Sequence, residues 1–247
     1  MIAYQYLRIS IHLLAGLWTC AVIFPRTDAA GRERRIQRWS GQLLSICGVQ
    51  LEVLHLVDGQ QAPASNAMIV SNHVSWLDIF VINTYQPCRF VAKADVRDWP
   101  LIGWLSSKAG TVFLARGNRR EVKRIYAGLV AAVHAGERVA FFPEGTTTEQ
   151  GMLLPFHANL FEAAIEAAVP VQPYALRYLD ASGALHPAVA FIGDMSFAQS
   201  ISIILKARQI RAELVRLPVI ETTGAQRRDI AQASRSSVAQ ALGHRQS

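Results

Sequence analysis

Short runs of consecutive apolar residues alternate with amphipathic stretches along most of the chain, and this alternation limits the fold more than any other feature. The runs predict buried strands at residues 67–71, 89–92, 111–115, 139–142, 171–175 and 188–192. Uninterrupted apolar strands are typical of parallel sheets that carry helices on both faces. Strands that alternate with helices indicate an α/β layer fold. We therefore expect a mostly parallel central sheet flanked by helices.

The stretches between these runs carry helix signals. Asn118 followed by Glu121, and Ser196 followed by Gln199, match the capping pattern that begins helices. Apolar and polar residues alternate over 210–214, which predicts a half-buried strand at the edge of the sheet. No internal repeat or low-complexity linker interrupts this part of the chain.

The beginning of the chain has a different character. Residues 9–24 contain no charged side chain, and Arg8 and Arg26 flank them. This run is shorter than the roughly 20 residues that a simple membrane-spanning helix needs. Residues 36–47 then follow helical spacing, with several arginines at their start. An apolar helix joined to a basic amphipathic helix suits one leaflet of a membrane, with the arginines on lipid phosphates.

These patterns predict two parts, a membrane-docking helical hairpin over residues 1–50 and an α/β domain over 51–247. Two alternatives stay open for the hairpin. It could be a buried pair of helices with a solvated basic face, or a cleaved signal peptide, although the bulky Trp18 makes a poor cleavage site. Three widely spaced cysteines without C-x-x-C pairs favour a reducing, cytoplasmic setting. We expect a protein on the cytoplasmic face of the inner or plasma membrane.

The composition narrows the class of partner. The formal net charge is +7, which favours acidic partners. Nucleic acid is not expected among them, because the arginines are not interleaved with aromatic residues and no recognition motif occurs. The motifs G-x-G-x-x-G, G-K-[ST], H-E-x-x-H and G-x-S-x-G are also absent. Their absence argues against dinucleotide binding, a phosphate loop, a zinc helix and a serine triad.

A histidine and an aspartate, His73 and Asp78, follow the strand predicted at 67–71. Within one regular helix they would lie about 140° apart, so they can meet only if His73 occupies the strand–helix turn. Asp78 could then accept a hydrogen bond from one ring nitrogen, which leaves the other nitrogen free to act as a general base. The alternative is that Asp78 only caps the helix with Ser75 and that His73 is a turn residue.

Two further strand ends carry side chains suited to ligand binding. Glu144 and Gly145 come directly after one predicted strand, and a glycine permits close approach of the backbone to a ligand. Arg116 follows another strand, and its guanidinium suits a phosphate or a carboxylate. Because α/β sheets keep their sites at the carboxyl ends of strands, we expect these groups near His73.

Together, these blocks resemble the glycerolipid acyltransferase family typified by 1-acylglycerol-3-phosphate acyltransferase. N-H-x-x-x-x-D at residues 72–78 matches the first family motif, and the strand that ends at Arg116 is similar to the second. F-P-E-G-T at residues 142–146 matches the third motif, and V-P-V-Q-P at residues 169–173 resembles the fourth. The resemblance spans about residues 67–176, and the N-terminal hairpin is similar to the family's membrane-docking helices.

The resemblance implies transfer of a fatty acyl group from a thioester, acyl-CoA or acyl-carrier protein, to the free hydroxyl of a lysolipid. It implies that His73 deprotonates this hydroxyl, that Asp78 orients His73, and that no acyl-enzyme forms. It also implies that Arg116, Glu144 and Gly145 position the acceptor and the developing oxyanion. No metal ion or bound cofactor is implied, and the expected partners are membrane lipids and the acyl donor.

The sequence departs from the family pattern near the third motif. Thr147 stands where phosphatidate-forming members typically carry an arginine, and His157 stands where many carry a lysine. An arginine–phosphate contact is hard to replace by a hydroxyl. These changes favour an acceptor without a phosphate monoester, such as lyso-ornithine lipid, whose enzymes are similar to this chain in F-P-E-G-T-T. Lysophosphatidate stays equally open, with Lys93, Arg116 or the basic residues that follow it on the phosphate. Thr146 completes the expected substrate contacts.

Two alternatives belong to other classes. A non-catalytic lipid-binding protein would not need His73, Asp78 and Glu144 together, because binding alone requires no positioned base. A hydrolase or metal enzyme built on His73, Asp78 and His157 fits the family resemblance less well.

Overall fold

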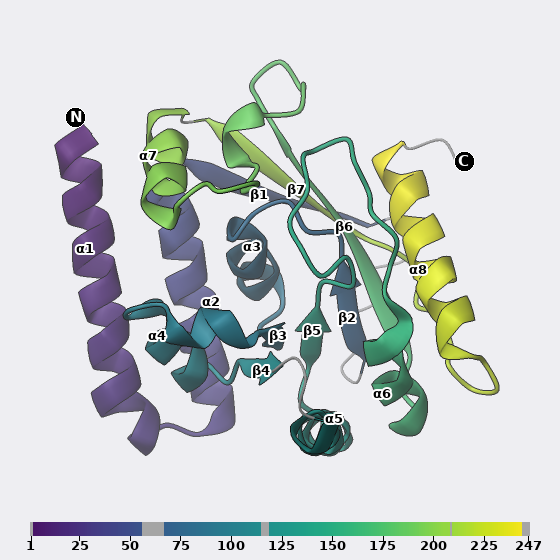
Figure 1. The fold of residues 1–247 in the computed structure, drawn as a ribbon. Helices are drawn as coiled ribbons and strands as arrows, with labels where there is room; N and C mark the ends of the chain where they lie inside the picture. Colours follow the sequence, from purple (N-terminus) through teal and green to yellow (C-terminus); the bar gives the residue numbers. More distant parts are fainter. Residues whose placement is uncertain (1, 56–66, 115–118, 208, 244–247) are drawn as a thin grey trace.

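One seven-stranded sheet forms the centre of the molecule. The computed structural model describes residues 2–55, 67–114, 119–207 and 209–243. The strand order is β1-β7-β6-β2-β5-β3-β4 (Figure 1). Neighbouring strands are parallel except β6 and β7, which are antiparallel. This confirms the predicted α/β class. The strands are β1 (Val49–His55), β2 (Met68–Ser71), β3 (Arg89–Lys93), β4 (Val112–Leu114), β5 (Val139–Phe141), β6 (Val171–Leu179) and β7 (Ile210–Arg216).

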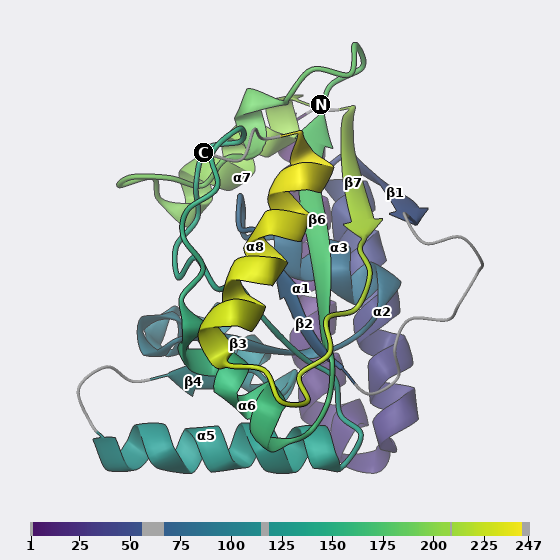
Figure 2. The ribbon, with the colours of Figure 1, turned by 90° about the vertical axis from the view of Figure 1, so that its right-hand side faces the viewer.

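Helices cover both faces of this sheet, as expected. They are α1 (Ile2–Trp18), α2 (Ala29–Ile46), α3 (Leu77–Tyr85), α4 (Ile102–Lys108), α5 (Arg119–His134), α6 (Phe161–Glu166), α7 (Phe197–Ala207) and α8 (Arg227–Leu242). In the two views, α1, α2, α3 and α7 lie on one side of the sheet, and α5, α6 and α8 lie towards the other (Figures 1 and 2). The helical start at Ser196 is confirmed by reciprocal hydrogen bonds with Gln199. The other proposed cap, at Asn118, lies outside the described residues.

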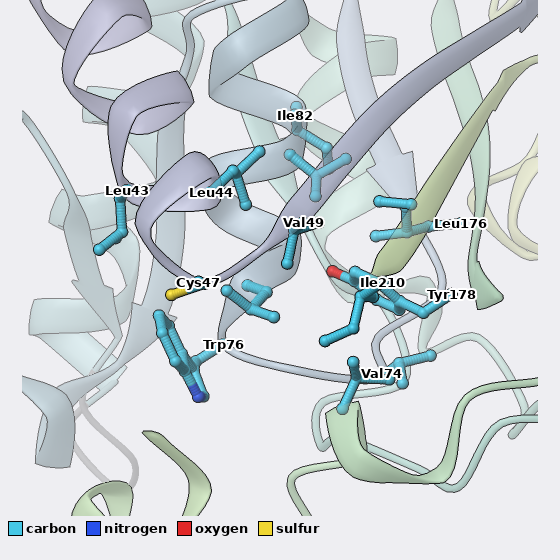
Figure 3. Packing of buried hydrophobic residues seen from close by; sticks show 14 of the residues in the cluster. Leu43, Leu44, Cys47, Val49, Val74, Trp76, Ile82, Leu176, Tyr178 and Ile210 are labelled. Carbon is cyan, nitrogen blue, oxygen red and sulfur yellow. The ribbon is translucent and has the colours of Figure 1, made fainter. Parts of the chain in front are cut away.

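Separate clusters of buried side chains hold these layers together. The largest joins α1, α2, α3 and α7 to the sheet through residues such as Leu43, Leu77 and Ile204. Figure 3 shows part of this cluster, in which Trp76 and Tyr178 come from segments far apart in the sequence. A second cluster packs α5, α6 and α8 against the other face. Burial of this much apolar surface is the main stabilising contribution to the fold.

The apolar runs predict most of the sheet but not all of it. β2 to β6 each lie on a predicted run. The strand expected at 188–192 does not form, because Pro187–Val189 is a short 3-10 helix that lacks one backbone donor at the proline. Val189 is nevertheless buried, and the Phe191 N–H donates to the Val74 carbonyl at 3.0 Å. The apolar character of this run thus belongs to a loop that covers the core.

The last strand also differs from its prediction. β7 was expected at an edge of the sheet, but it lies between β1 and β6. Its buried Glu213 is paired, since it accepts from Arg177 of β6 at 2.6 Å and from Arg211 at 3.1 Å. The edge position belongs instead to β1, whose polar residues hid it from the sequence pattern.

The first helix is longer than the uncharged run on which its prediction rested. Helical structure continues from α1 through Thr19–Ile23 and Phe24–Arg26. Among the described residues, this 25-residue stretch, Ile2–Arg26, is long and apolar enough to cross a membrane by length and composition. The expectation of too short a helix is therefore wrong, because the helix begins well before the uncharged run. Large apolar side chains are exposed along it, including Tyr4, Leu7, Ile11, Leu14 and Trp18.

The helices α1 and α2 are joined by a reciprocal contact. His12 Nε2 and the Trp39 carbonyl lie 3.0 Å apart, and Trp39 Nε1 donates to the His12 carbonyl at 3.1 Å. The two rings stack with centroids 4.4 Å apart. Gly16 makes this approach feasible, since a Cβ there would lie 2.8 Å from Trp39 Nε1. The two helices therefore pack at a specific position rather than through general apolar contact.

Candidate active site

The loop between β2 and α3 places His73 against Asp78. β2 ends at Ser71, His73 lies in the turn, and Asp78 lies in the first turn of α3. His73 Nδ1 is 2.8 Å from Asp78 Oδ2, and the exposed fraction of the side chain is 18% for His73 and 0% for Asp78. The pair thus has a buried carboxylate and an imidazole that reaches the surface.

Asp78 accepts hydrogen bonds from several donors besides the imidazole. Oδ2 also accepts from the backbone N–H of Val74 at 2.7 Å and of Ser75 at 3.0 Å. Oδ1 accepts from the Tyr178 hydroxyl at 2.6 Å. The bond from the Ser75 N–H to Asp78, which belongs to the suggested cap, is therefore present together with the His73 contact, whereas the Ser75 hydroxyl makes no capping bond. An ionised carboxylate only accepts hydrogen bonds, so the contact with Asp78 favours the tautomer of His73 that carries its proton on Nδ1.

The backbone and ring of His73 are held as firmly as its Nδ1 atom. Its ring stacks on Phe142 with centroids 3.9 Å apart and planes 6° from parallel. Its N–H donates to Glu144 Oε1 at 2.7 Å, and its carbonyl accepts from the Thr148 N–H at 2.9 Å. Since Phe142, Glu144 and Thr148 all follow β5, the segment after β5 fixes the histidine in place.

Glu144 is buried beneath this segment, with an exposed fraction of 3%. While Oε1 accepts from His73, Oε2 accepts from the Leu154 N–H at 2.9 Å. Burial raises the pKa of the Glu144 carboxyl above its ordinary value, and the bonds from Leu154 and His73 oppose that rise. The carboxylate therefore connects two loops through their backbone.

Gly145 and His157 lie on the outer side of the same segment. Gly145 has φ +71°, in the left-handed region that favours glycine, and its N–H donates to the Phe142 carbonyl at 3.1 Å. A Cβ at Gly145 would lie 3.5 Å from His157 Cδ2, so the imidazole of His157 borders this turn. The His157 N–H donates to the Pro143 carbonyl at 2.9 Å. Gly145 and Thr146 are both exposed.

The remaining site candidates are Thr147, Lys93 and Arg116, and the two that lie within the described residues form no hydrogen bond with the His73–Asp78 pair. The Thr147 hydroxyl donates to the Phe191 carbonyl, so it ties the segment after β5 to the loop before α7. Lys93 is exposed at the end of β3, which β5 separates from β2 in the sheet. Arg116 lies outside the described residues. The structure therefore brings His73, Asp78, Glu144, Gly145, Thr147 and His157 together around one loop pair.

Three residues at this site were not singled out as site residues from the sequence. They are Asn72, Gln150 and Tyr178. Tyr178 belongs to β6, and the other two bond to the backbone of that strand. Asn72 Oδ1 accepts from the Leu176 N–H at 2.8 Å, and Gln150 Oε1 accepts from the Tyr178 N–H at 2.7 Å. Tyr178 is fully buried. A tyrosine in an apolar strand looks like a core residue, so the sequence offered no signal for its contact with Asp78.

A cavity of about 320 Å³ adjoins the turn on one side. Its lining includes Asn72, Gln150 and Arg177, together with apolar residues of α8 and β6, but it does not include His73, Asp78 or Glu144. Among the described residues, no group of three or more His, Cys, Asp or Glu side chains could hold a metal ion.

Comparison with known proteins shows the family of this chain. The family model described as acyltransferase matches residues 54–177, which contain the whole His73–Asp78 region. The chain is 36% identical over 219 residues to a lyso-ornithine lipid O-acyltransferase of Pseudomonas aeruginosa, covering 88% of this chain and 82% of that one. The chain belongs to the acyltransferase family.

Other similar proteins are named as acyltransferases of 1-acyl-sn-glycerol-3-phosphate. A 1-acyl-sn-glycerol-3-phosphate acyltransferase of Neisseria meningitidis is 37% identical over 166 residues, covering 66% of this chain and 63% of that one. The 1-acyl-sn-glycerophosphate acyltransferase PlsC of Thermotoga maritima, a solved structure, superposes with a TM-score of 0.66 at 19% identity. It covers 100% of this chain and 96% of that chain, and it supports the fold. The family resemblance seen in the sequence is thus confirmed.

Proposed function

We propose that this acyltransferase moves a fatty acyl group from a thioester, acyl-CoA or acyl-carrier protein, to the free hydroxyl of a lysolipid in membrane lipid biosynthesis. The observation that carries the proposal is the contact between the partly exposed His73 and the buried Asp78. With the proton on Nδ1 directed to Asp78, Nε2 is the basic atom of the ring and can accept the proton of an acceptor hydroxyl.

The reaction follows from this arrangement. As His73 Nε2 takes the hydroxyl proton, the lipid oxygen attacks the thioester carbonyl and a tetrahedral oxyanion forms. The negative Asp78 stabilises the imidazolium that results. Collapse of the oxyanion breaks the carbon–sulfur bond, and the imidazolium returns its proton to the leaving thiolate. The products are the diacylated lipid and the free thiol, so the histidine is regenerated without an acyl-enzyme.

For the acceptor, we propose lyso-ornithine lipid. The similarity to the enzymes of that name extends over 88% of the chain in Pseudomonas aeruginosa and 81% in Rhodobacter capsulatus, against 66% for the Neisseria meningitidis relative. Thr147 supports the same acceptor, because its hydroxyl is bonded to the Phe191 carbonyl and it supplies no cation to a phosphate. Lysophosphatidate is the second candidate, favoured by the identity of 37% to the Neisseria enzyme.

The N-terminal helices support action at a membrane surface. The exposed face of α1 carries Tyr4, Leu7, Ile11, Leu14 and Trp18, which are side chains suited to the boundary between headgroups and acyl chains. We propose that this face attaches the enzyme to the cytoplasmic side of the membrane that holds its lysolipid. The positive net charge of the chain favours both anionic lipids and an acidic acyl donor.

The test uses the full chain in mixed micelles with a labelled acyl thioester. Lyso-ornithine lipid and lysophosphatidate are offered side by side, with acyl-CoA and acyl-carrier protein as separate donors and His73→Ala as the control. We expect transfer to the aminolipid that the His73→Ala variant loses. Transfer to lysophosphatidate alone would overturn the acceptor, and equal turnover by both proteins would overturn the role of His73. A wild-type protein that transfers to neither lipid would contradict the proposed reaction.

A further inference from the structure

We propose that Tyr178 is a positioning residue for the His73–Asp78 pair, an inference that rests on the proposed acyl transfer. The Tyr178 hydroxyl donates to Asp78 Oδ1 at 2.6 Å, and both side chains are fully buried. The other oxygen, Oδ2, serves His73 and the backbone N–H groups of Val74 and Ser75. Tyr178 therefore holds the side of the carboxylate that the histidine loop leaves open.

The position of Tyr178 is itself fixed beyond the end of β2. The last β2 residue in the ladder, Ser71, pairs with Tyr174 of β6. Past that point, the side-chain amide of Asn72 bonds both the N–H and the carbonyl of Leu176, at 2.8 and 2.9 Å. The amide of Gln150 does the same at Tyr178, at 2.7 and 3.1 Å. The two amides thus continue the hydrogen bonding of the sheet along β6.

These hydrogen bonds join three separate parts of the chain in series. Gln150 lies in the loop after β5, Tyr178 on β6, and Asp78 on α3, and each bonds the next. The hydroxyl and the carboxylate are 100 residues apart in the sequence. Asp78 is therefore oriented from the sheet side by β6 as well as by the turn that precedes α3, and His73 is oriented through Asp78.

The electrostatic effect of Tyr178 has a definite sign. Burial, followed by the nearby charge of Asp78 and the bond to it, raises the pKa of the Tyr178 phenol well above its ordinary value, so the hydroxyl remains a donor. A donor to Asp78 stabilises the ionised carboxylate. Within the described part of the chain, the titratable groups bonded to His73 are Asp78 on α3 and Glu144 after β5, with Tyr178 behind Asp78. Without the hydroxyl, the His73–Asp78 pair binds its catalytic proton more tightly.

The same strand offers a matched control. Tyr174 lies four residues earlier on the same face of β6, is fully buried, and donates its hydroxyl to Gln86. Tyr178→Phe and Tyr174→Phe therefore each remove one buried hydroxyl and leave the ring in place. Both variants should have a lower melting temperature, because each removes one buried hydrogen bond. Only Tyr178→Phe removes a donor from Asp78.

The experiment measures the pH profile of kcat and KM for both variants with the full chain in micelles. For Tyr178→Phe, we expect the acidic limb of the kcat profile to move about one to two pH units higher, since hydrogen bonds to charged groups are that strong. On the acidic limb, kcat then falls by about tenfold or more, with KM unchanged. Tyr174→Phe should keep the wild-type profile. The His73 ring titration, followed by NMR without substrate, should show the same upward shift in Tyr178→Phe alone.

The outcomes separate this inference from the proposed function. A Tyr178→Phe profile and His73 titration equal to those of Tyr174→Phe would overturn the positioning role and leave a packing role. If Tyr178→Phe does not fold, Gln150→Ala, which loosens Tyr178 from the adjoining loop, must shift the limb in the same direction, or the inference is wrong. If wild-type protein transfers to neither lipid, the proposed function fails, whereas the His73 titration still decides the role of Tyr178.

Discussion

Glu144 Oε1 accepts a hydrogen bond from the His73 backbone N–H at 2.7 Å, so the acidic residue after β5 holds the peptide of the histidine directly. Its other oxygen holds Leu154. The resemblance to known acyltransferases implies a contact with substrate at this position, yet both oxygens are engaged by the enzyme's own backbone. The carboxylate thus connects the segment after β5 to the turn after β2.

Replacing Glu144 by glutamine should lower activity without removing the His73–Asp78 contact. An amide has one acceptor oxygen and one donor nitrogen. Its nitrogen would therefore face one of the two N–H groups that now donate to Glu144, and that hydrogen bond would be lost. We expect a loss of about 1–3 kcal/mol in unfolding free energy and a lower kcat. Denaturant unfolding and the micelle assay measure both. Unchanged stability would contradict the buried double contact.

The pH dependence of the unfolding free energy should also report the raised pKa of the Glu144 carboxyl. Burial places its folded pKa above the ordinary value of 4.5, so the folded state binds more protons in the window between the two values. The Glu144 contribution is therefore fully present below pH 4.5 and is lost as pH rises through the folded pKa. Unfolding free energy of wild type minus that of Glu144→Gln should decline across this window. A flat difference would show that the carboxyl is not desolvated.

Asp78→Asn should abolish most of the activity. The amide nitrogen cannot accept from the donors that surround Asp78, and it gives His73 no negative partner. We expect kcat to fall roughly 10²- to 10⁴-fold, the range that general-base catalysis contributes. Asp180→Asn is the control, since Asp180 caps an exposed turn with Ser182. If Asp78→Asn retained kcat within a factor of a few, the pair would not be the base.

A methyl group at Gly16 should loosen the first helix from the second. The Cβ of Gly16→Ala would lie 2.8 Å from Nε1 of Trp39, whose ring is fixed by its stack on His12. Gly128→Ala on α5 meets no atom within 4 Å. We expect Gly16→Ala to lower the melting temperature and Gly128→Ala to raise stability by about 0.5–1 kcal/mol. Calorimetry of the detergent-solubilised protein measures the melting temperatures of both variants. Equal melting temperatures would contradict the close contact at Gly16.

The part of the site that could be predicted lies within short segments of sequence. His73 and Asp78 are five residues apart, so a strand–turn–helix is enough to bring them together. Tyr178 is 100 residues from Asp78, and its contact depends on which strand lies beside β2. Neither strand order nor the direction of a buried tyrosine is encoded in local periodicity. For this reason the sequence predicted the pair but not the residue behind it.

In the fold too, features set by nearby residues could be predicted, and features set by contacts between distant segments could not. Continuous apolar runs predicted β2 to β6, because burial on both faces leaves a local mark. The polar residues of β7 suggested an edge, although ion pairs from neighbouring strands allow them in the interior of the sheet. At Thr147 the sequence showed which side chain was present, but the bond to Phe191 decides where its hydroxyl points.

The position of β1 has a consequence for the order in which the protein is assembled. In the described sheet β1 is an edge strand and its neighbour is β7, from the far end of the chain. During synthesis, α1, α2 and β1 leave the ribosome long before residues 210–216 exist to receive them. The sheet therefore cannot close at β1 until β7, its last strand, has been made. Throughout that interval the exposed apolar face of α1 is available for the membrane contact proposed above.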